Sequence, residues 1–364
     1  MMFAKRILAI FVSTACAATF LAGCSDDSWA AKTDDTTVPA GQYIYYILKE
    51  TMDAEQKLDA TPSTSDSDFF KLTIEDQSAE NWIQSHAQKD MKNAVGAEIE
   101  FENLGLSLTD EETKEIADQV DNYYDSLDEY YHISDLGISK NSLEKAMTDN
   151  KKYDKVFDSY YQAGGSQEVP AEDISNYIRN EGASYKMMTV PKDVSPQIST
   201  DSADTPGTVT ATDSSTATAQ GYVDQINSGK SFDDVYHDYE ISTGTTEEDF
   251  VPLELQYAFK DEPLDLSDEV YSAIFDKAQV DGPAVLAEGD DSFYIIQRYS
   301  VSDETVSQEH DAALTEMKED EFSGELSQIA DTKNYQENNG ALDRYSPRAI
   351  QKRLDKFRQS SLGY

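Results

Sequence analysis

The sequence predicts an α+β protein with a mainly helical lobe, an α+β middle section and further helices towards the C-terminal end. Three patterns lead to this prediction. Apolar residues recur at helical spacing through residues 40–180, short strand and helix signals alternate through residues 181–302, and helical spacing returns in residues 303–364. The first of these segments has no βαβ alternation, which argues against a doubly wound α/β fold.

Residues 1–23 have the composition of a signal peptide. A short basic region, Lys5 and Arg6, precedes an apolar run from Ile7 to Leu21 that is short for a membrane span. The run ends in Leu21-Ala22-Gly23-Cys24, which resembles the lipobox cut by lipoprotein signal peptidase. We therefore expect cleavage before Cys24, a lipid on its thiol, and attachment to the outer face of the cell membrane. The alternative is an ordinary signal peptide followed by an incidental cysteine.

Residues 24–39 are small, polar and acidic, and predict a flexible lipidated tether. The chain has a formal net charge of −42, which excludes nucleic-acid binding because the phosphate backbone would be repelled. The second cysteine, Cys16, lies inside the signal peptide, so we expect no disulfide in the mature chain.

The lobe at residues 40–180 is assembled from segments of helical periodicity. Residues 38–52 fit either a buried strand or a first helix, and the polar residues 61–68 predict a loop. A long helix is expected over residues 73–101. Thr109 and Glu112 form a capping box for a helix to about residue 131, Ser139 caps the next helix, and Pro170 begins a short one.

The middle section begins with a strand at residues 183–190. Residues 191–219, rich in Ser, Thr, Asp and Pro, predict a disordered loop. Short helices follow at residues 221–228, 232–239 and 269–277. Alternation around Glu288-Gly289-Asp290-Asp291 then predicts a hairpin over residues 283–301.

A helix is expected from residue 304 to about residue 332, and another near the C-terminal end. Residues 344–364 contain six basic side chains and one acidic one. Ile350, Leu354 and Phe357 fall on one helical face, which predicts a terminal helix docked on the acidic helical lobe. Contact with a membrane surface is the alternative.

This order of parts resembles the foldase lipoproteins of Gram-positive bacteria, relatives of SurA and the PrsA foldases. Ala183–Val190 occupies the place of the first strand of a parvulin-type prolyl isomerase domain, and Tyr222–Val235 is similar to its helix, glycine turn and second helix. Residues 270–278 stand where the pocket-lining helix lies, and Gly289–Tyr299 resembles the final hairpin. The resemblance implies that residues 40–180 and 303–364 pack into one chaperone lobe around an inserted parvulin-like domain at residues 181–302.

The resemblance also places candidate site residues, and there the sequence departs from the family pattern. Active parvulins carry a histidine in the first strand and another in the last strand, flanking the prolyl bond. These positions fall here on Met187 (Lys186 with a one-residue shift) and on Tyr294. Val270 and Phe275 fall in the pocket helix. We therefore expect a degenerate site whose isomerase activity is weak or lost, which favours a protein that is not an enzyme.

The function implied by the resemblance is that of a membrane-anchored extracytoplasmic chaperone for unfolded or emerging exported polypeptides. One alternative is an active peptidyl-prolyl isomerase of the same family, and another is a solute-binding or structural surface lipoprotein. No cofactor is expected. No metal site is expected either, because His86, His132, His237 and His310 are scattered without ligand spacing. The sequence does not indicate the oligomeric state.

Overall fold

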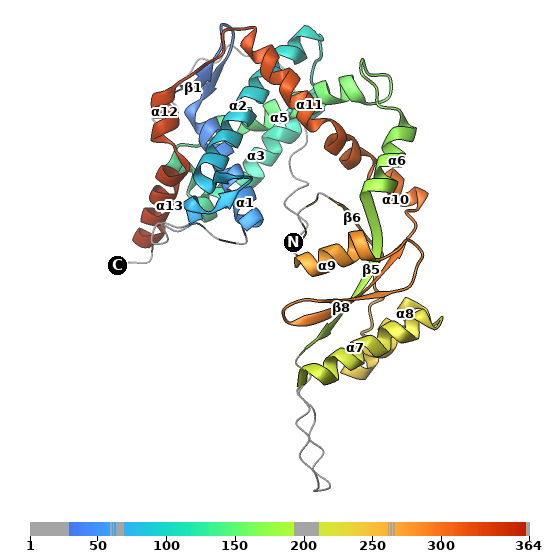
Figure 1. The fold of residues 1–364 in the computed structure, drawn as a ribbon. Coiled ribbons are helices and arrows are strands. Elements are labelled where there is room, and N and C mark those ends of the chain that lie inside the picture. Colours follow the sequence, from blue (N-terminus) through green and yellow to red (C-terminus); the bar gives the residue numbers. More distant parts are fainter. Residues whose placement is uncertain are drawn as a thin grey trace, which may run out of the picture. The chain divides into compact units, whose positions relative to one another are not determined.

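The element order follows the predicted sequence of helical, mixed and helical segments. The computed structural model describes residues 29–58, 60, 62, 69–192, 211–260, 262, 264 and 266–361. These residues divide into two compact units, one within residues 1–168 and 317–364 and the other within residues 169–316. The predicted fold class is confirmed, because N- and C-terminal segments build a helical unit and an α+β unit is inserted between them (Figure 1).

The helical unit has four long helices from the N-terminal segment and C-terminal helices that return to them. Its elements are β1 (Trp29–Lys32), β2 (Thr37–Pro39), α1 (Ala40–Leu58), η1 (Phe69–Lys71), β3 (Thr73–Ile74), β4 (Gln77–Ser78), α2 (Ala79–Asn103), α3 (Asp110–Tyr131), α4 (Ile133–Leu136), α5 (Lys140–Tyr161), the later part of α11 (His310–Asp331), β9 (Gln336–Glu337), α12 (Asn339–Arg344) and α13 (Pro347–Ser361). The capping box at Thr109 and the cap at Ser139 are confirmed.

The predicted flexible tether is wrong for residues 29–39. β1 lies in the middle of a three-stranded antiparallel sheet of order β2-β1-β9. Ala30, Ala31 and Val38 are buried in the core of the helical unit. These residues are held in place because a strand about 305 residues later, at Gln336 and Glu337, pairs with β1. Residues 24–28 lie outside the described part of the chain.

In this unit the structure decides one alternative that the sequence left open and corrects the start of one predicted helix. Residues 40–58 form a helix, which decides the ambiguity over residues 38–52. The predicted helix over residues 73–101 starts only at Ala79, since Glu75 and Asp76 adopt left-handed φ values of 49° and 63° in the turn of a hairpin. Ser78 then caps α2 by accepting a hydrogen bond from the Asn81 amide. Of the predicted loop at residues 61–68, only Pro62 is described.

The C-terminal helix docks on the helical unit, as its apolar face predicts. Ile350 and Leu354 are buried in the same core as α1 and α2, and Phe357 packs against that core. Arg348 forms an ion pair with Glu80 of α2 at 3.0 Å. The apolar face of α13 is therefore used inside the protein.

Helix α2 of the N-terminal segment and helix α11 of the C-terminal segment cross at a short distance. A Cβ built on Gly96 would lie 2.1 Å from the carbonyl oxygen of Leu326, so only glycine fits. Next to it, Asn93 donates to the Ser323 hydroxyl at 2.7 Å and accepts from the Ser327 hydroxyl at 3.1 Å. This crossing holds the C-terminal segment against α2 after the whole inserted unit.

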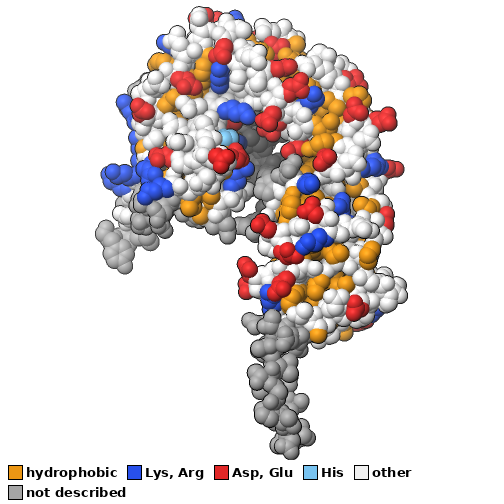
Figure 2. Space-filling model, viewed as in Figure 1, with side chains coloured by type: hydrophobic (Ala, Val, Ile, Leu, Met, Phe, Trp, Pro, Cys, Tyr) orange, Lys and Arg blue, Asp and Glu red, His pale blue; other side chains and the backbone are white. Residues whose placement is uncertain are grey.

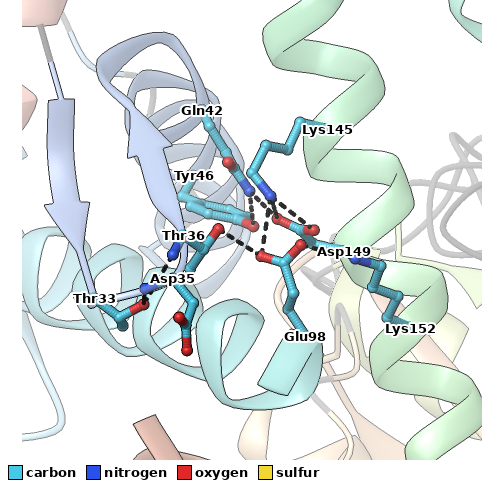
Figure 3. Close-up of polar contacts among 9 residues, drawn as sticks. All are labelled: Thr33, Asp35, Thr36, Gln42, Tyr46, Glu98, Lys145, Asp149 and Lys152. Carbon is cyan, nitrogen blue, oxygen red and sulfur yellow. Dashed lines mark hydrogen bonds and ion pairs between the residues drawn. The ribbon is translucent and has the colours of Figure 1, made fainter. Parts of the chain in front are cut away.

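A buried polar network connects the β1–β2 turn with α1, α2 and α5 (Figure 3). Glu98 accepts from Thr36 at 2.8 Å, from Lys152 at 2.8 Å and from Lys145 at 3.3 Å. Lys145 also pairs with Asp149, which accepts from Gln42 at 2.8 Å. Burial would raise the pKa of Glu98, but the two lysines and their hydrogen bonds outweigh it and lower that pKa to about 2. Asp149 has the opposite shift, since burial raises its pKa.

The inserted unit is built around a four-stranded antiparallel sheet of order β6-β5-β8-β7. Its elements are α6 (Ala171–Glu181), β5 (Gly182–Pro191), α7 (Ala211–Asn227), α8 (Phe232–Thr243), β6 (Gln256–Phe259), α9 (Asp268–Ser272), the π-helical turn η2 (Ala273–Lys277), β7 (Val285–Glu288), β8 (Ser292–Tyr299) and α10 (Asp303–Gln308). The predicted first strand and final hairpin are both present. Helices α7 and α8 cover one face of the sheet, and α9 with η2 covers the other (Figure 1).

The predicted loop at residues 191–219 is too long at its C-terminal end. Helix α7 starts at Ala211, and Ser215, Ala219 and Val223 are buried at helical spacing. Small side chains let this part of the helix approach the sheet closely. Because several of them are polar, the sequence shows no helical pattern of large apolar residues here. Residues 193–210 lie outside the described residues. The helix expected over residues 304–332 is interrupted at Glu309, which separates α10 from α11.

We expect Gly96→Ala to lower the free energy of unfolding by about 2 kcal/mol, because the added methyl group forces α2 and α11 apart. Gly324→Ala is the matched control in α11, where an added Cβ meets nothing within 4 Å. It should stabilise the protein by about 0.5–1 kcal/mol through helix propensity. Chemical denaturation measures both changes. Equal effects of the two substitutions would contradict the close crossing.

We also expect Glu98→Gln to change how stability depends on pH. A carboxyl group whose pKa is lowered on folding stabilises the folded state above its ordinary pKa of 4.5, and that contribution disappears as pH falls towards 2. The advantage of the wild type over the variant in the free energy of unfolding should therefore be about 3 kcal/mol smaller at pH 2 than at pH 4.5. The charge of Glu98 is one cause of the raised pKa of Asp149, so the same comparison in an Asp149→Asn background controls for the change at Asp149. Denaturation curves at several pH values measure the difference, and a constant difference would refute the assignment.

Candidate binding surface on the inserted unit

The sheet of the inserted unit separates two apolar clusters by strand alternation. Met188, Val190, Phe293 and Ile295 point to the side covered by α7 and α8. Ala183, Tyr185, Met187, Tyr294 and Ile296 belong to the cluster on the side of α9 and η2. Because side chains alternate along β5 and β8, each cluster has its own set of strand positions.

The four candidate residues named from the sequence lie in one cluster. Met187 is paired with Ile296 across the sheet, and Tyr294 lies between Thr189 of β5 and Ala287 of β7. Val270 of α9 is buried beneath them with Ala273 and Ile274, and Phe275 packs at the edge of the same cluster.

Six apolar side chains of this cluster remain partly exposed above a buried floor. We call them the sheet-face surface: Met187, Leu264, Leu266, Phe275, Val285 and Tyr294. The floor beneath them includes Val270, Ile274, Ala287 and Ile296, all of which are nearly inaccessible. Figure 2 shows apolar side chains reaching the surface of the inserted unit among acidic and basic ones. An arrangement of this kind can bind apolar side chains of a partner.

Sequence reasoning missed several members of this region. Leu264, Leu266 and Val285 were not singled out, although Val285 follows from the alternation of the predicted hairpin. Arg298 was also missed, and it lies on the same side of β8 as Tyr294 and Ile296. Its guanidinium donates to the carbonyl of Phe275 at 3.3 Å and to that of Gly182 at 3.2 Å. Burial lowers its pKa. Arg298 therefore connects η2 to the start of β5.

The described contacts of the four histidines are with residues outside this surface. His86 stacks on Trp82 with ring centroids 3.9 Å apart, and His132 lies beside Phe357. His237 contacts Glu247, and His310 contacts Asp311. Among the described residues, no group of three or more His, Cys, Asp or Glu side chains could hold a metal ion. The sheet-face surface thus offers apolar contact together with the hydroxyl group of Tyr294.

The described residues contain no helix that is both long enough and apolar enough to span a bilayer. Cys24, the expected lipidation site, precedes the described part of the chain.

No protein-family model matches the chain, and no curated protein does. Among solved structures, the chain is similar to the foldase protein PrsA from Lactococcus lactis, with 11% identity, a TM-score of 0.35, and coverage of 88% of this chain and 98% of that one. It is also similar to foldase protein PrsA from Streptococcus pneumoniae, with 10% identity, a TM-score of 0.31, and coverage of 91% and 94%. At TM-scores this low, neither match assigns a family or an activity to this chain.

Proposed function

We propose that this protein is a chaperone that holds unfolded exported polypeptides, and that the sheet-face surface is one of its binding regions. The observation that carries the proposal is the set of half-buried apolar side chains above a fully buried floor. Such a surface gains free energy by covering apolar side chains of another polypeptide. It has no fixed polar contacts that would select one small molecule.

The side chains of this surface suit contact with many sequences. Met187 is flexible and polarisable, and Phe275 and Tyr294 offer broad ring faces. Surfaces of this composition repack around different partners, which is typical of promiscuous binding. Because the chain carries a net charge of −42, we expect it to remain soluble and to disfavour strongly acidic clients.

We further propose that the inserted unit is a parvulin-like domain whose isomerase activity is weak or lost. A strand, two helices, a short helix and a final hairpin follow one another in the order that the sequence resemblance implies, and β6 is an additional strand before the short helix. The barrier to prolyl rotation is about 18–20 kcal/mol, so catalysis requires a site that stabilises the twisted imide. By the sequence resemblance, Met187 and Tyr294 stand where active parvulins have histidines, and a thioether cannot replace an imidazole as a proton donor.

An active prolyl isomerase remains the second candidate function, since Tyr294 keeps a hydroxyl donor at one of these positions. A solute-binding lipoprotein would instead be expected to have two doubly wound lobes, whereas the four-stranded sheet described here is entirely antiparallel.

For localisation, we propose export and attachment to the outer face of the membrane through a lipid on Cys24. The fold supports a specific form of this attachment. Trp29 already belongs to β1, so only residues 25–28 connect Cys24 to the helical unit. At about 3.3–3.6 Å per extended residue, this connection reaches roughly 15–20 Å. The helical unit would therefore be held close to the bilayer.

We expect Met187→Asp to weaken binding of an unfolded client by about tenfold, because a carboxylate within the sheet-face surface loses hydration when a client covers it. Met52→Asp is the matched control, since Met52 is 41% exposed on α1 in the other unit. Suppression of client aggregation and titration of client affinity would measure both variants. Equal losses in the two variants would refute the assigned surface.

The same protein should be tested for isomerisation of a proline-containing peptide. Suppressed aggregation without isomerase activity would support the proposed holding function. Clear isomerase activity that falls when Tyr294 is replaced by Phe would establish the second candidate function.

For the anchor, we expect Cys24→Ser to release the protein from the membrane fraction and to remove the mass of the lipid from the mature chain. Fractionation of cells that express each form, followed by intact-mass measurement, makes this test. Wild-type protein without a lipid on Cys24 would overturn the proposed anchoring.

A further inference from the structure

Strand β5 is paired unequally on its two sides. Along β8 it pairs from Ser184 to Pro191, whereas along β6 it pairs only from Gly182 to Tyr185. The second half of β5 therefore has a strand on one side only. The chain that leads into β6, residues 251–255, forms no strand.

The direction of each backbone group in β5 follows from two hydrogen bonds. The Lys192 amide donates to the Asp291 carbonyl at 2.9 Å, in register with the β5–β8 ladder, so even-numbered residues bond towards β8. The Lys260 amide donates to the Glu181 carbonyl at 2.8 Å, so odd-numbered residues point towards β6. By this alternation, the N–H and C=O groups of Met187 and Thr189 point to the side without a strand.

Within the described residues, no hydrogen bond is made to the backbone of Met187 or Thr189 from that side. Thr189 is exposed and Met187 is partly exposed, and the segment before β6 packs through Leu253 against the cluster on the side of α7 and α8. We call the backbone from Met187 to Thr189 the open edge. It presents two donors and two acceptors at the spacing of a strand, next to the sheet-face surface.

We propose that the open edge binds an extended segment of a client polypeptide, which adds to the sheet beside β5 in line with β6. This inference rests on the proposed holding function and specifies how the client is recognised. Backbone hydrogen bonds to the client do not depend on its sequence, which suits a binder of many clients. The client residue opposite Met187 would lie on the same face as Met187, so its side chain would meet the sheet-face surface.

A client segment fits this edge better than a second copy of the chain does. Two copies would each bring a net charge of −42, and their repulsion opposes edge-to-edge pairing. The free length is also short, since β6 occupies one end and Pro191, which has no N–H, terminates the other. A short extended peptide segment matches this length.

The test uses the full-length protein, a soluble peptide of alternating Val and Thr, and the same peptide with all of its internal backbone nitrogens methylated, so that neither edge of the peptide can donate. Amide hydrogen exchange resolved by residue should show that the peptide protects Met187 and Thr189. Met188 and Val190, which bond to β8, should exchange slowly with or without peptide. We expect methylation to weaken binding by about tenfold, because the donors that pair with the open edge are lost.

A pair of variants examines the protein side of the same contact. Thr189→Pro removes an N–H that points away from β8, whereas Thr189→Val keeps that N–H and changes only the side chain. Slow exchange at Met188 and Val190 would verify that β5 and β8 remain paired in both variants. The proline variant should bind the peptide several-fold more weakly, and the valine variant should bind it as the wild type does.

The outcomes separate this inference from the function on which it rests. If the protein suppresses client aggregation, but Met187 and Thr189 stay unprotected and both peptides bind equally, the open edge is not the binding site and the holding function stands. If neither clients nor peptides bind, both proposals fail. Protection of Met187 and Thr189 without peptide, together with a dimer in sedimentation, would assign the edge to a second copy and overturn the inference.

Discussion

The crossing of α2 with α11 is the contact on which the helical unit depends. The chain leaves this unit near residue 168 and returns near residue 317, so the C-terminal helices must find their place after a long insertion. Gly96 lets the two helices approach to backbone contact, and Asn93 fixes their register through Ser323 and Ser327. After this crossing, β9 pairs with β1 and α13 packs on α1 and α2. Without β9, the strand β1 would lose its second neighbour.

The polar network around Glu98 complements this crossing from the other side of α2. Its members come from the β1–β2 turn and from α1, α2 and α5, so it connects four segments of the N-terminal part. Buried charges of this kind add specificity when every partner is present and cost stability when one is lost. Shifted pKa values in a cluster often mark an active site. Here each charged group has a protein partner, which favours a structural role for the network.

Local signals predicted those parts of the fold that are determined locally. The capping box at Thr109 and the strand at residues 183–190 follow from short-range chemistry and are present as expected. The strand at residues 29–32 could not be predicted, because its burial depends on a partner about 300 residues later. The hairpin before α2 was missed because its turn uses Glu75 and Asp76 in place of glycine. Alternation of side chains along β5 and β8 predicts that Met187 and Tyr294 lie on the same face of the sheet. The contact of Leu264 and Leu266 with this cluster depends on tertiary packing and could not be predicted from the sequence.

The inserted unit combines two means of contact that a polypeptide client can use together. The sheet-face surface favours apolar side chains, while the adjacent open edge offers hydrogen bonds to any extended backbone. Apolar contact alone would retain collapsed as well as extended chains, and backbone pairing alone would be weak in water because it replaces hydrogen bonds to solvent. Where the two coincide, an extended segment with an apolar side chain opposite Met187 gains both contributions. A folded protein, whose strands are already paired, gains neither. Such a surface would therefore distinguish unfolded from folded polypeptides without a catalytic group, and release would follow when the client forms its own backbone hydrogen bonds.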